Sequence, residues 1–147
     1  MQTIKVSVKK MTPTAIVPKV HSLGAAGFDL CADIEETIVI PPHETVMISS
    51  GLAFEIPEGY FGAIYARSGI STKRGLRPAN CVGVIDSDYR GPVGLPLHND
   101  TDEERIVEPH ERVAQMILQE TFSVLLDEVD ELGDTERGSG GFGSTGR

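Results

Sequence analysis

Residues 83–92 read Gly83-Val84-Ile85-Asp86-Ser87-Asp88-Tyr89-Arg90-Gly91-Pro92. Two carboxylates, a tyrosine and an arginine stand between glycines, and an apolar run leads into them. A β-branched run that stops at Asp-Ser-Asp and resumes at Val93 predicts a β-hairpin. Asp and Ser also favour turns for a local reason, because their side chains hydrogen-bond to nearby backbone groups. By itself, the stretch therefore fits either an ordinary turn or a reactive loop.

The C-terminal residues form a second unusual stretch. Residues 137–147 consist of Arg137 and a glycine-rich segment with one phenylalanine, Phe142. Such a segment has no core to bury, and it fits either a linker or an arm that closes over a ligand. The preceding residues 127–136 hold six acids in ten and predict a solvated tether. We therefore divide the chain into a β domain (1–126), an acidic tether (127–136) and a flexible, glycine-rich C-terminal arm (137–147).

Length and composition favour one domain built from short strands. The chain has 147 residues, which suits one domain and is short for two. It contains 16 glycines and 9 prolines, which favour frequent turns over long helices. The composition therefore predicts an all-β fold.

The net charge of −9 argues against two classes of partner. Proteins that bind nucleic acid or a membrane surface usually present a basic field. We therefore expect no nucleic-acid and no membrane partner. A small anionic ligand remains compatible with this charge if a few arginines are local to its site.

Cysteine usage and apolar runs indicate the compartment. Cys31 and Cys81 lie in apolar stretches and form no Cys-x-x-Cys pair, which predicts two buried, reduced thiols. The first residues lack the apolar core of a signal peptide, and no apolar run approaches the ~20 residues of a membrane span. We therefore expect a cytoplasmic protein.

Several segments have the alternation or composition of short strands. They occupy residues 2–9, 36–40, 45–50, 51–56, 60–66, 91–98, 112–118 and 124–126. Pro96 interrupts one of them, so we expect an edge or a bulge there. One short helix is expected over residues 68–74, with Ser68 as its N-cap and Gly75 as its stop. Many short strands between turns predict a sandwich, a jelly roll or a small barrel.

Polar residues beside glycines form a set that suits a nucleotide. Phosphate ligands favour backbone N–H groups, arginines and hydroxyls. Residues of these types beside glycines are Arg67, Ser68, Arg137, Ser144 and Thr145. Phe142 offers an aromatic face to a base, and Asp86 offers a carboxylate that can activate water.

Each of these features also has a plain structural interpretation. Arg67 and Ser68 can simply begin a helix, Gln115 can be an ordinary sheet residue, and Arg137 can pair with a neighbouring acid. Asp29 stands among apolar neighbours, so we expect it to have a partner or to face a cleft.

Five motifs follow one another along the chain. They are Ala26-Gly27-Phe28-Asp29-Leu30, Arg67-Ser68-Gly69, the stretch 83–91, Arg112-Val113-Ala114-Gln115-Met116-Ile117, and Arg137-Gly138-Ser139-Gly140-Gly141-Phe142-Gly143-Ser144-Thr145-Gly146. In this order and spacing they resemble the motifs of the trimeric dUTP diphosphatases (dUTPases), over nearly the whole chain. The resemblance implies a jelly-roll-like fold with one short helix and a homotrimer with active sites at the subunit interfaces. It also implies Mg²⁺-assisted hydrolysis of dUTP to dUMP and diphosphate, which removes dUTP from the nucleotide pool and supplies dUMP for dTMP synthesis.

The resemblance also implies a role for each motif residue. Asp86 would activate the water that attacks the α-phosphorus in line, with Asp29 and Gln115 as the other catalytic residues. The implied substrate-binding residues are Arg67, Ser68 and Gly69 from a neighbouring subunit, Asn80 and Gly83 at the uracil edge, Tyr89 under the deoxyribose, and Arg137, Phe142, Gly143, Ser144 and Thr145 in the arm. Mg²⁺ would be held by the triphosphate and waters without a direct protein ligand, and Asp29 would stand behind that first layer.

Two alternatives remain open. A dCTP deaminase shares the fold and some motifs. In such an enzyme, the resemblance implies a glutamate in the strand after the hairpin that activates water at the base. That strand has no acid here, since residues 93–98 read Val-Gly-Leu-Pro-Leu-His. The other alternative is a jelly-roll protein that binds nucleotide without turning it over. Pro96, His98 and the acidic tether depart from what the resemblance leads us to expect, and their roles stay open.

Overall fold

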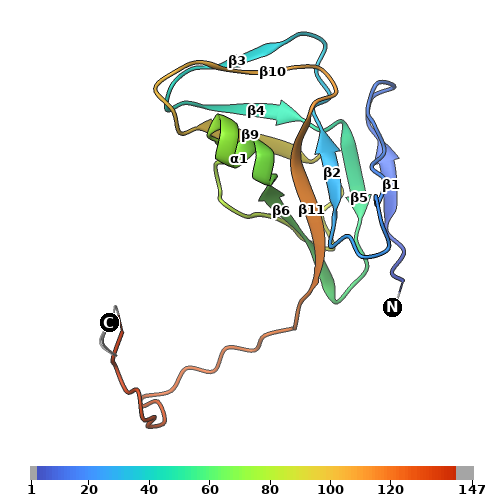
Figure 1. Cartoon of the computed structure of the whole chain (residues 1–147). Coiled ribbons are helices and arrows are strands. Elements are labelled where there is room, and N and C mark those ends of the chain that lie inside the picture. Colours follow the sequence, from blue (N-terminus) through green and yellow to red (C-terminus); the bar gives the residue numbers. More distant parts are fainter. Residues whose placement is uncertain (1–2, 142–147) are drawn as a thin grey trace.

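The computed structural model describes residues 3–141 and is dominated by short strands (Figure 1). The described residues form one helix, α1 (Ser68–Arg74), and strands β1 (Ser7–Lys10), β2 (Phe28–Cys31), β3 (Ile38–Ile40), β4 (Thr45–Ser49), β5 (Leu52–Glu55), β6 (Tyr60–Ala66), β7 (Leu76–Pro78), β8 (Gly83–Ile85), β9 (Gly94–Asn99), β10 (Arg105–Val107) and β11 (Arg112–Glu120). The prediction of an all-β chain with one short helix is confirmed.

The strands pair in antiparallel sheets that enclose one core. The largest sheet has the order β2-β11-β6-β8, and a second has the order β4-β9-β7. Two further pairs, β1-β5 and β10-β3, complete the described sheets. Leu30 and Met116 of the first sheet and Ile48 and Leu97 of the second are all at most 1% exposed, and they belong to the same apolar cluster. The core therefore lies between the two larger sheets.

The C-terminal end of the helix was predicted correctly, whereas its N-cap residue was not. Its bounds agree with the predicted range 68–74, and Gly75 ends it in the left-handed conformation with φ 65°. The N-cap, however, is Arg67, whose backbone is extended and whose side chain makes no capping hydrogen bond. Ser68 already has helical geometry, so its hydroxyl does not cap the first turn and stays exposed.

The predicted hairpin over residues 83–95 is wrong. Strand β8 pairs with β6 in the four-stranded sheet, whereas β9 pairs with β4 and β7 in the other sheet. The connecting residues therefore cross from one sheet to the other. Val93 is tied to β5 rather than to β8, because its N–H donates to Leu52 O (2.8 Å) and its carbonyl accepts from the Ser50 hydroxyl (2.6 Å).

Pro96 lies neither at an edge nor at a bulge, because β9 is the middle strand of its sheet. It stands opposite Met47 of β4, and its carbonyl accepts from the N–H of Ala79 at 2.7 Å. The N–H and the C=O of one strand residue point toward the same neighbouring strand. The N–H that Pro96 lacks would therefore point toward β7, which has already ended at Pro78. No ladder bond to β4 is lost, and the sheet tolerates a central proline.

Other differences concern short or peripheral segments. Strands β2, β7 and β10 were not predicted, and residues 124–126, expected to be a strand, lie in the range 121–141 that contains neither strand nor helix. This range extends away from the sheets (Figure 1). The expectation of two buried thiols is wrong for Cys81, which is exposed at a turn with φ 62°, while Cys31 is half-buried.

In the part of the chain that the structure describes, the single helix is far too short to cross a bilayer.

Asn99 provides a test of how the loops are held to this core. Its fully buried side chain donates to the carbonyls of Ile40, Pro41 and Glu103 (2.8–3.1 Å) and accepts from Thr101. Asn99→Ala removes these hydrogen bonds from a buried position and leaves a cavity there, so we expect a loss of about 2–4 kcal/mol in the free energy of unfolding, measured by denaturant titration.

The control for this substitution is Glu103→Ala, which keeps the backbone acceptor and removes only an exposed ion pair with Arg105. It should cost less than about 1 kcal/mol. Equal losses in the two variants would contradict the assigned role of Asn99.

Candidate active site

Three side chains lie around Asp29 of β2: Arg67, which directly follows β6, and Arg112 and Gln115 of β11. One carboxylate oxygen of Asp29 accepts from Arg67 Nε at 2.9 Å, and the other accepts from Arg112 Nη1 at 3.2 Å. Arg67 Nη1 also donates to the backbone carbonyl of Arg112 at 2.9 Å, and Gln115 Nε2 donates to Ala66 O at 2.8 Å. We call Asp29, Arg67, Arg112 and Gln115 the Asp29 cluster. The expectation that Asp29 has a partner is confirmed.

A β-bulge in β11 brings Arg112 into this cluster. In the pairing of β11 with β2, Arg112 stands opposite Cys31 and Ala114 opposite Leu30, so Val113 is an extra residue. Asp29 stands opposite Gln115. In a regular strand, positions 112 and 115 would point to opposite faces. The bulge reverses that alternation and places Arg112 on the face that carries Asp29 and Gln115.

The first residues of α1 adjoin the Asp29 cluster. Ser68 and Gly69 are exposed, and no side chain caps the first turn. Uncapped N–H groups at the start of a helix are available to a ligand. The cluster and this turn together present arginine, hydroxyl and backbone donors, which suit a phosphate.

The second group is the Asp86 loop, which we define as residues 86–92. The N–H of Tyr89 donates to Asp86 O at 3.2 Å and forms a tight turn. The Tyr89 hydroxyl donates to Pro92 O at 3.0 Å and folds back over Gly91, where a Cβ would lie 2.4 Å from that hydroxyl. Only glycine fits at position 91 in this arrangement, and the Tyr89 side chain stays 43% exposed.

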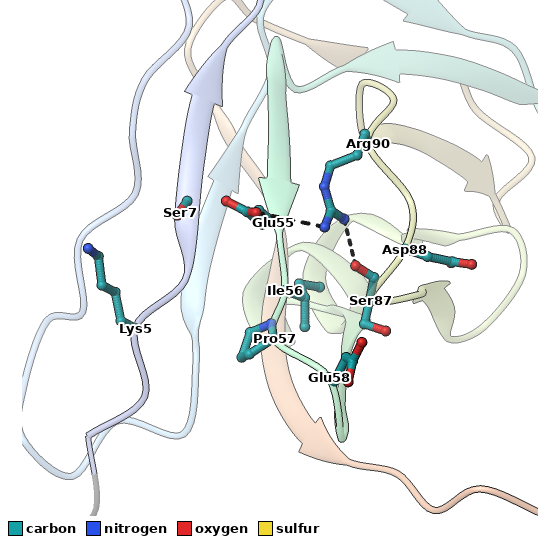
Figure 2. A pocket seen from close by; sticks show the side chains of 9 residues that line it. All are labelled: Lys5, Ser7, Glu55, Ile56, Pro57, Glu58, Ser87, Asp88 and Arg90. Carbon is teal, nitrogen blue, oxygen red and sulfur yellow. Dashed lines mark hydrogen bonds and ion pairs between the residues drawn. The ribbon is translucent and has the colours of Figure 1, made fainter.

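Two hollows flank the Asp86 loop. One, of about 430 Å³, lies between β1, the end of β5 and the loop, and Figure 2 shows Arg90 reaching across it from the loop toward Glu55. The other, of about 550 Å³, is lined by Asp86 together with Tyr60, Phe61 and Val84. Thr121, at the root of the C-terminal segment, also lines this second hollow. Asp86 therefore borders a space beside the point where the chain leaves β11 at Thr121.

Asn80 and Gly83 lie together, as the sequence predicts for a shared role. A Cβ at Gly83 would lie 3.3 Å from Asn80 Nδ2, so the amide of Asn80 covers this glycine. Gly83 pairs with Ile64 in the middle of β6. These residues offer side-chain and backbone hydrogen-bonding groups at the start of β8.

One chain does not bring all predicted site residues together. The Asp29 cluster lies at the Ala66 end of β6, and the Asp86 loop lies at its Tyr60 end. Seven residues at roughly 3.3 Å each separate these ends by about 20 Å. Arg137 is exposed on the segment that leads away from the sheets. Phe142, Gly143, Ser144 and Thr145 lie outside the described residues.

The Asp29 cluster also affects a thiol. Burial raises the pKa of the Cys31 thiol above its ordinary value, and the negative charge of Asp29 raises it further, while Arg112 and Arg67 lower it. Cys31 is thereby kept protonated, and we assign it a structural role. Among residues 3–141, no three His, Cys, Asp or Glu side chains gather into a group able to hold a metal ion.

These observations define an antiparallel β protein with an acidic loop and a separate arginine–carboxylate cluster. The family model of the dUTPases matches residues 13–146. The chain is 43% identical over 143 residues to the deoxyuridine 5'-triphosphate nucleotidohydrolase of Hydrogenobaculum sp., a match that covers 97% of this chain and 99% of that protein. It is 44% identical over 148 residues to the enzyme of the same name from Bdellovibrio bacteriovorus, covering 100% of this chain and 99% of the relative.

A solved structure of the Staphylococcus bacteriophage 80alpha dUTPase with dUPNHPP is also similar. Its TM-score is 0.88 at 30% identity, with 99% of this chain and 100% of the phage chain covered. The chain belongs to the dUTPase family. The predicted family and jelly-roll-like fold are thereby confirmed.

Sequence reasoning gave no role to two residues that the structure makes prominent. Arg112 holds Asp29, and Arg90 binds the backbone of the Asp86 loop. Both stand inside the quoted motifs, so their presence was visible. Their contacts were not, because they depend on a bulge and on the path of a loop.

The different environments of the two thiols predict different reactivity. Cys81 is exposed, whereas Cys31 is half-buried and its pKa is raised, which lowers its thiolate fraction. At pH 7.5, iodoacetamide should therefore alkylate Cys81 faster than Cys31, as followed by mass spectrometry of the peptides. Cys81→Ser should remove the fast phase. Preferential labelling of Cys31 would contradict the buried, Asp29-facing position described for this thiol.

Proposed function

We propose that this protein hydrolyses dUTP to dUMP and diphosphate. The observation that carries the proposal is that a chain of the dUTPase family presents Asp86 on a tight, exposed loop beside a hollow. Phosphoryl transfer depends on positioning and on charge neutralisation more than on covalent chemistry by the protein. An acidic loop and a separate set of arginine and backbone donors supply these two requirements.

Asp86 acts on the attacking water. Its carboxylate accepts a proton from the water, whose oxygen attacks the α-phosphorus in line with the bond to the bridging oxygen. That bond breaks and diphosphate leaves. A carboxylate held in a turn has a fixed direction, which favours a role as general base, and the turn is set by the Tyr89–Asp86 backbone hydrogen bond.

Base and sugar are read on either side of Asp86. Asn80 and the backbone at Gly83 bind the edge of uracil, where a pattern of donors and acceptors rejects cytosine. Tyr89 places its ring under the deoxyribose and leaves no room for a 2′-hydroxyl. The hydroxyl of Tyr89 already donates a hydrogen bond to Pro92 O, which fixes the position of the ring against the Asp86 loop.

The phosphate groups are bound by the Asp29 cluster and the first turn of α1 from a second copy of the chain. Arg67, Ser68 and Gly69 contact phosphate oxygens, Gln115 lies near the α-phosphate, and Asp29 fixes the orientation of Arg67. The separation of about 20 Å along β6 supports a site shared between copies, because one chain does not join both groups. Such sharing fits a homotrimer with sites at its interfaces.

The C-terminal segment supports both association and closure. Phe122, Leu125 and Leu126 are 82–93% exposed at the root of the tether, and such apolar side chains favour cover by another copy. Beyond the acidic tether (127–136), the arm (137–147) closes over the site. Arg137, Ser144 and Thr145 bind the γ-phosphate, Gly143 lets the backbone approach, and Phe142 stacks on uracil.

The proposed site would take Mg²⁺ together with the substrate. The ion would supply positive charge beside the phosphate oxygens, and it would be held mainly by the triphosphate and waters. The residues present fit this arrangement, because both carboxylate oxygens of Asp29 already accept from arginines. Asp29 therefore acts behind the first layer of ligands and holds the arginines that face the phosphates.

The biological role follows from the reaction. Hydrolysis removes dUTP from the nucleotide pool and supplies dUMP for dTMP synthesis. We place the activity in the cytoplasm, which is consistent with two free cysteines.

A substrate panel tests the proposed function. Diphosphate and ammonia release are measured with dUTP, UTP, dCTP and dTTP. Diphosphate from dUTP alone supports the proposal. Ammonia from dCTP would indicate a deaminase, although β9 carries no acid, and binding of dUTP without turnover would indicate a nucleotide-binding protein.

Asp86→Asn tests the general base. The substitution keeps size and polarity but removes proton acceptance, so kcat for dUTP should fall by about 100- to 10,000-fold with little change in dUTP affinity. Steady-state kinetics and equilibrium binding measure the two quantities. Asp88→Asn is the matched control on the same loop and should stay within a few-fold of the wild type. Equal effects at both positions would refute a specific role for Asp86.

Tyr89 tests how the sugar is read. Tyr89→Ala removes the ring that excludes a 2′-hydroxyl, so the ratio of kcat/KM for dUTP over UTP should fall by about tenfold or more. Tyr89→Phe loses only the bond to Pro92 and should keep most of the discrimination. If the alanine variant still rejects UTP as the wild type does, the ribose is read elsewhere.

A further inference from the structure

Arg90 holds the backbone of the Asp86 loop from one side. Its Nη1 donates to Ser87 O at 2.6 Å and to Tyr89 O at 3.1 Å, and Figure 2 shows the first of these contacts. We propose that Arg90 is a positioning residue, which sets the Asp86 carboxylate and the Tyr89 ring in their working geometry without touching substrate. The inference rests on the proposed function and assigns this arginine a part in it.

The two contacts fix two peptide planes. In a planar trans peptide the N–H points opposite to the preceding carbonyl. When the carbonyls of Ser87 and Tyr89 face the guanidinium, the N–H groups of Asp88 and Arg90 must face away from it. Figure 2 shows that the Asp88 side chain is also directed away from Arg90. The guanidinium therefore sets the path of the backbone on both sides of Asp88.

The other anchors of the loop act near its ends. Ile85 is held in the ladder opposite Gly62, and Val93 is tied to Leu52. Between them, the Tyr89–Asp86 turn bond and the Tyr89–Pro92 bond are contacts within the loop itself. Arg90 is the link that binds the middle of the loop and also reaches another strand, because its Nη2 lies 3.9 Å from Glu55 of β5.

Of the contacts of Arg90, the carbonyl contacts matter more than the ion pair. The pair with Glu55 is long and both side chains are more than half exposed, and exposed pairs of this kind contribute little. Both carbonyls accept from one nitrogen, Nη1, which the planar guanidinium holds in a fixed direction, whereas a lysine ammonium is a point charge at the end of a flexible stem. Positioning should therefore be lost with glutamine, partly lost with lysine and kept when Glu55 is changed.

The experiment compares Arg90→Gln, Arg90→Lys and the matched control Glu55→Gln in the full-length protein. Because displacement of a reacting group by about 1 Å can cost about 100-fold, kcat for dUTP should fall by about 10- to 100-fold in Arg90→Gln. KM should change by less than about threefold. The dUTP/UTP discrimination should fall together with kcat, because one loop carries both Asp86 and Tyr89. Thermal unfolding and sedimentation monitor folding and assembly.

Chemical rescue keeps the test decisive where a variant is less stable. Arg90→Ala supplied with guanidinium at low millimolar concentration should regain part of kcat, whereas urea at the same concentration should not restore it. Unchanged kcat in Arg90→Gln, or a loss confined to KM, would overturn the proposal. So would a loss that guanidinium fails to restore in a folded protein. If the wild type does not release diphosphate from dUTP, the proposed function fails instead.

Discussion

The extra residue in β11 is the constraint on which the arginine–carboxylate half of the site depends. Strand β11 pairs with both β2 and β6, so its alternation decides which side chains leave the largest sheet on each face. A single inserted position, Val113, turns Arg112 toward Asp29 while Ala114 and Met116 keep their places in the core. Arg67 then binds both the carboxylate of Asp29 and the carbonyl of Arg112. One strand thus contributes side chains both to the buried core and to the charged cluster.

The length of β6 separates the two groups of proposed site residues within one chain. Asp86 follows β8 at one end of β6, and Arg67 follows β6 itself at the other. Both positions are fixed by pairing in the same sheet, so loop movement does not bring them together. A site that needs the acid and the arginines must draw them from different copies. The exposed apolar residues at the root of the tether are consistent with such an assembly.

Local signals in the sequence were enough for some elements and not for others. The bounds of α1 and β6 were predicted correctly, because a glycine stop and an alternating run are properties of neighbouring residues. The hairpin over residues 83–95 was wrong because its strands join different sheets, and pairing between distant segments leaves no local mark. For the same reason, β2, β7, β10 and the bulge at Val113 were not predicted. The residues of the site were visible as motifs, whereas their division into two groups was expected only from the family resemblance and had no local signal in the sequence.

The Asp86 loop, to which we assign the general base, is backbone that belongs to no sheet. Its ends are fixed by a ladder bond at Ile85 and by the anchoring of Val93 to β5. Between these ends, the conformation rests on a tyrosine that folds over a glycine and on an arginine that binds two carbonyls. The residues Asp-Ser-Asp-Tyr-Arg-Gly therefore act as one unit, in which the neighbours of Asp86 set the direction of its carboxylate. In the proposed mechanism, Asp86 without Arg90 would keep its charge but lose the direction that the loop gives it.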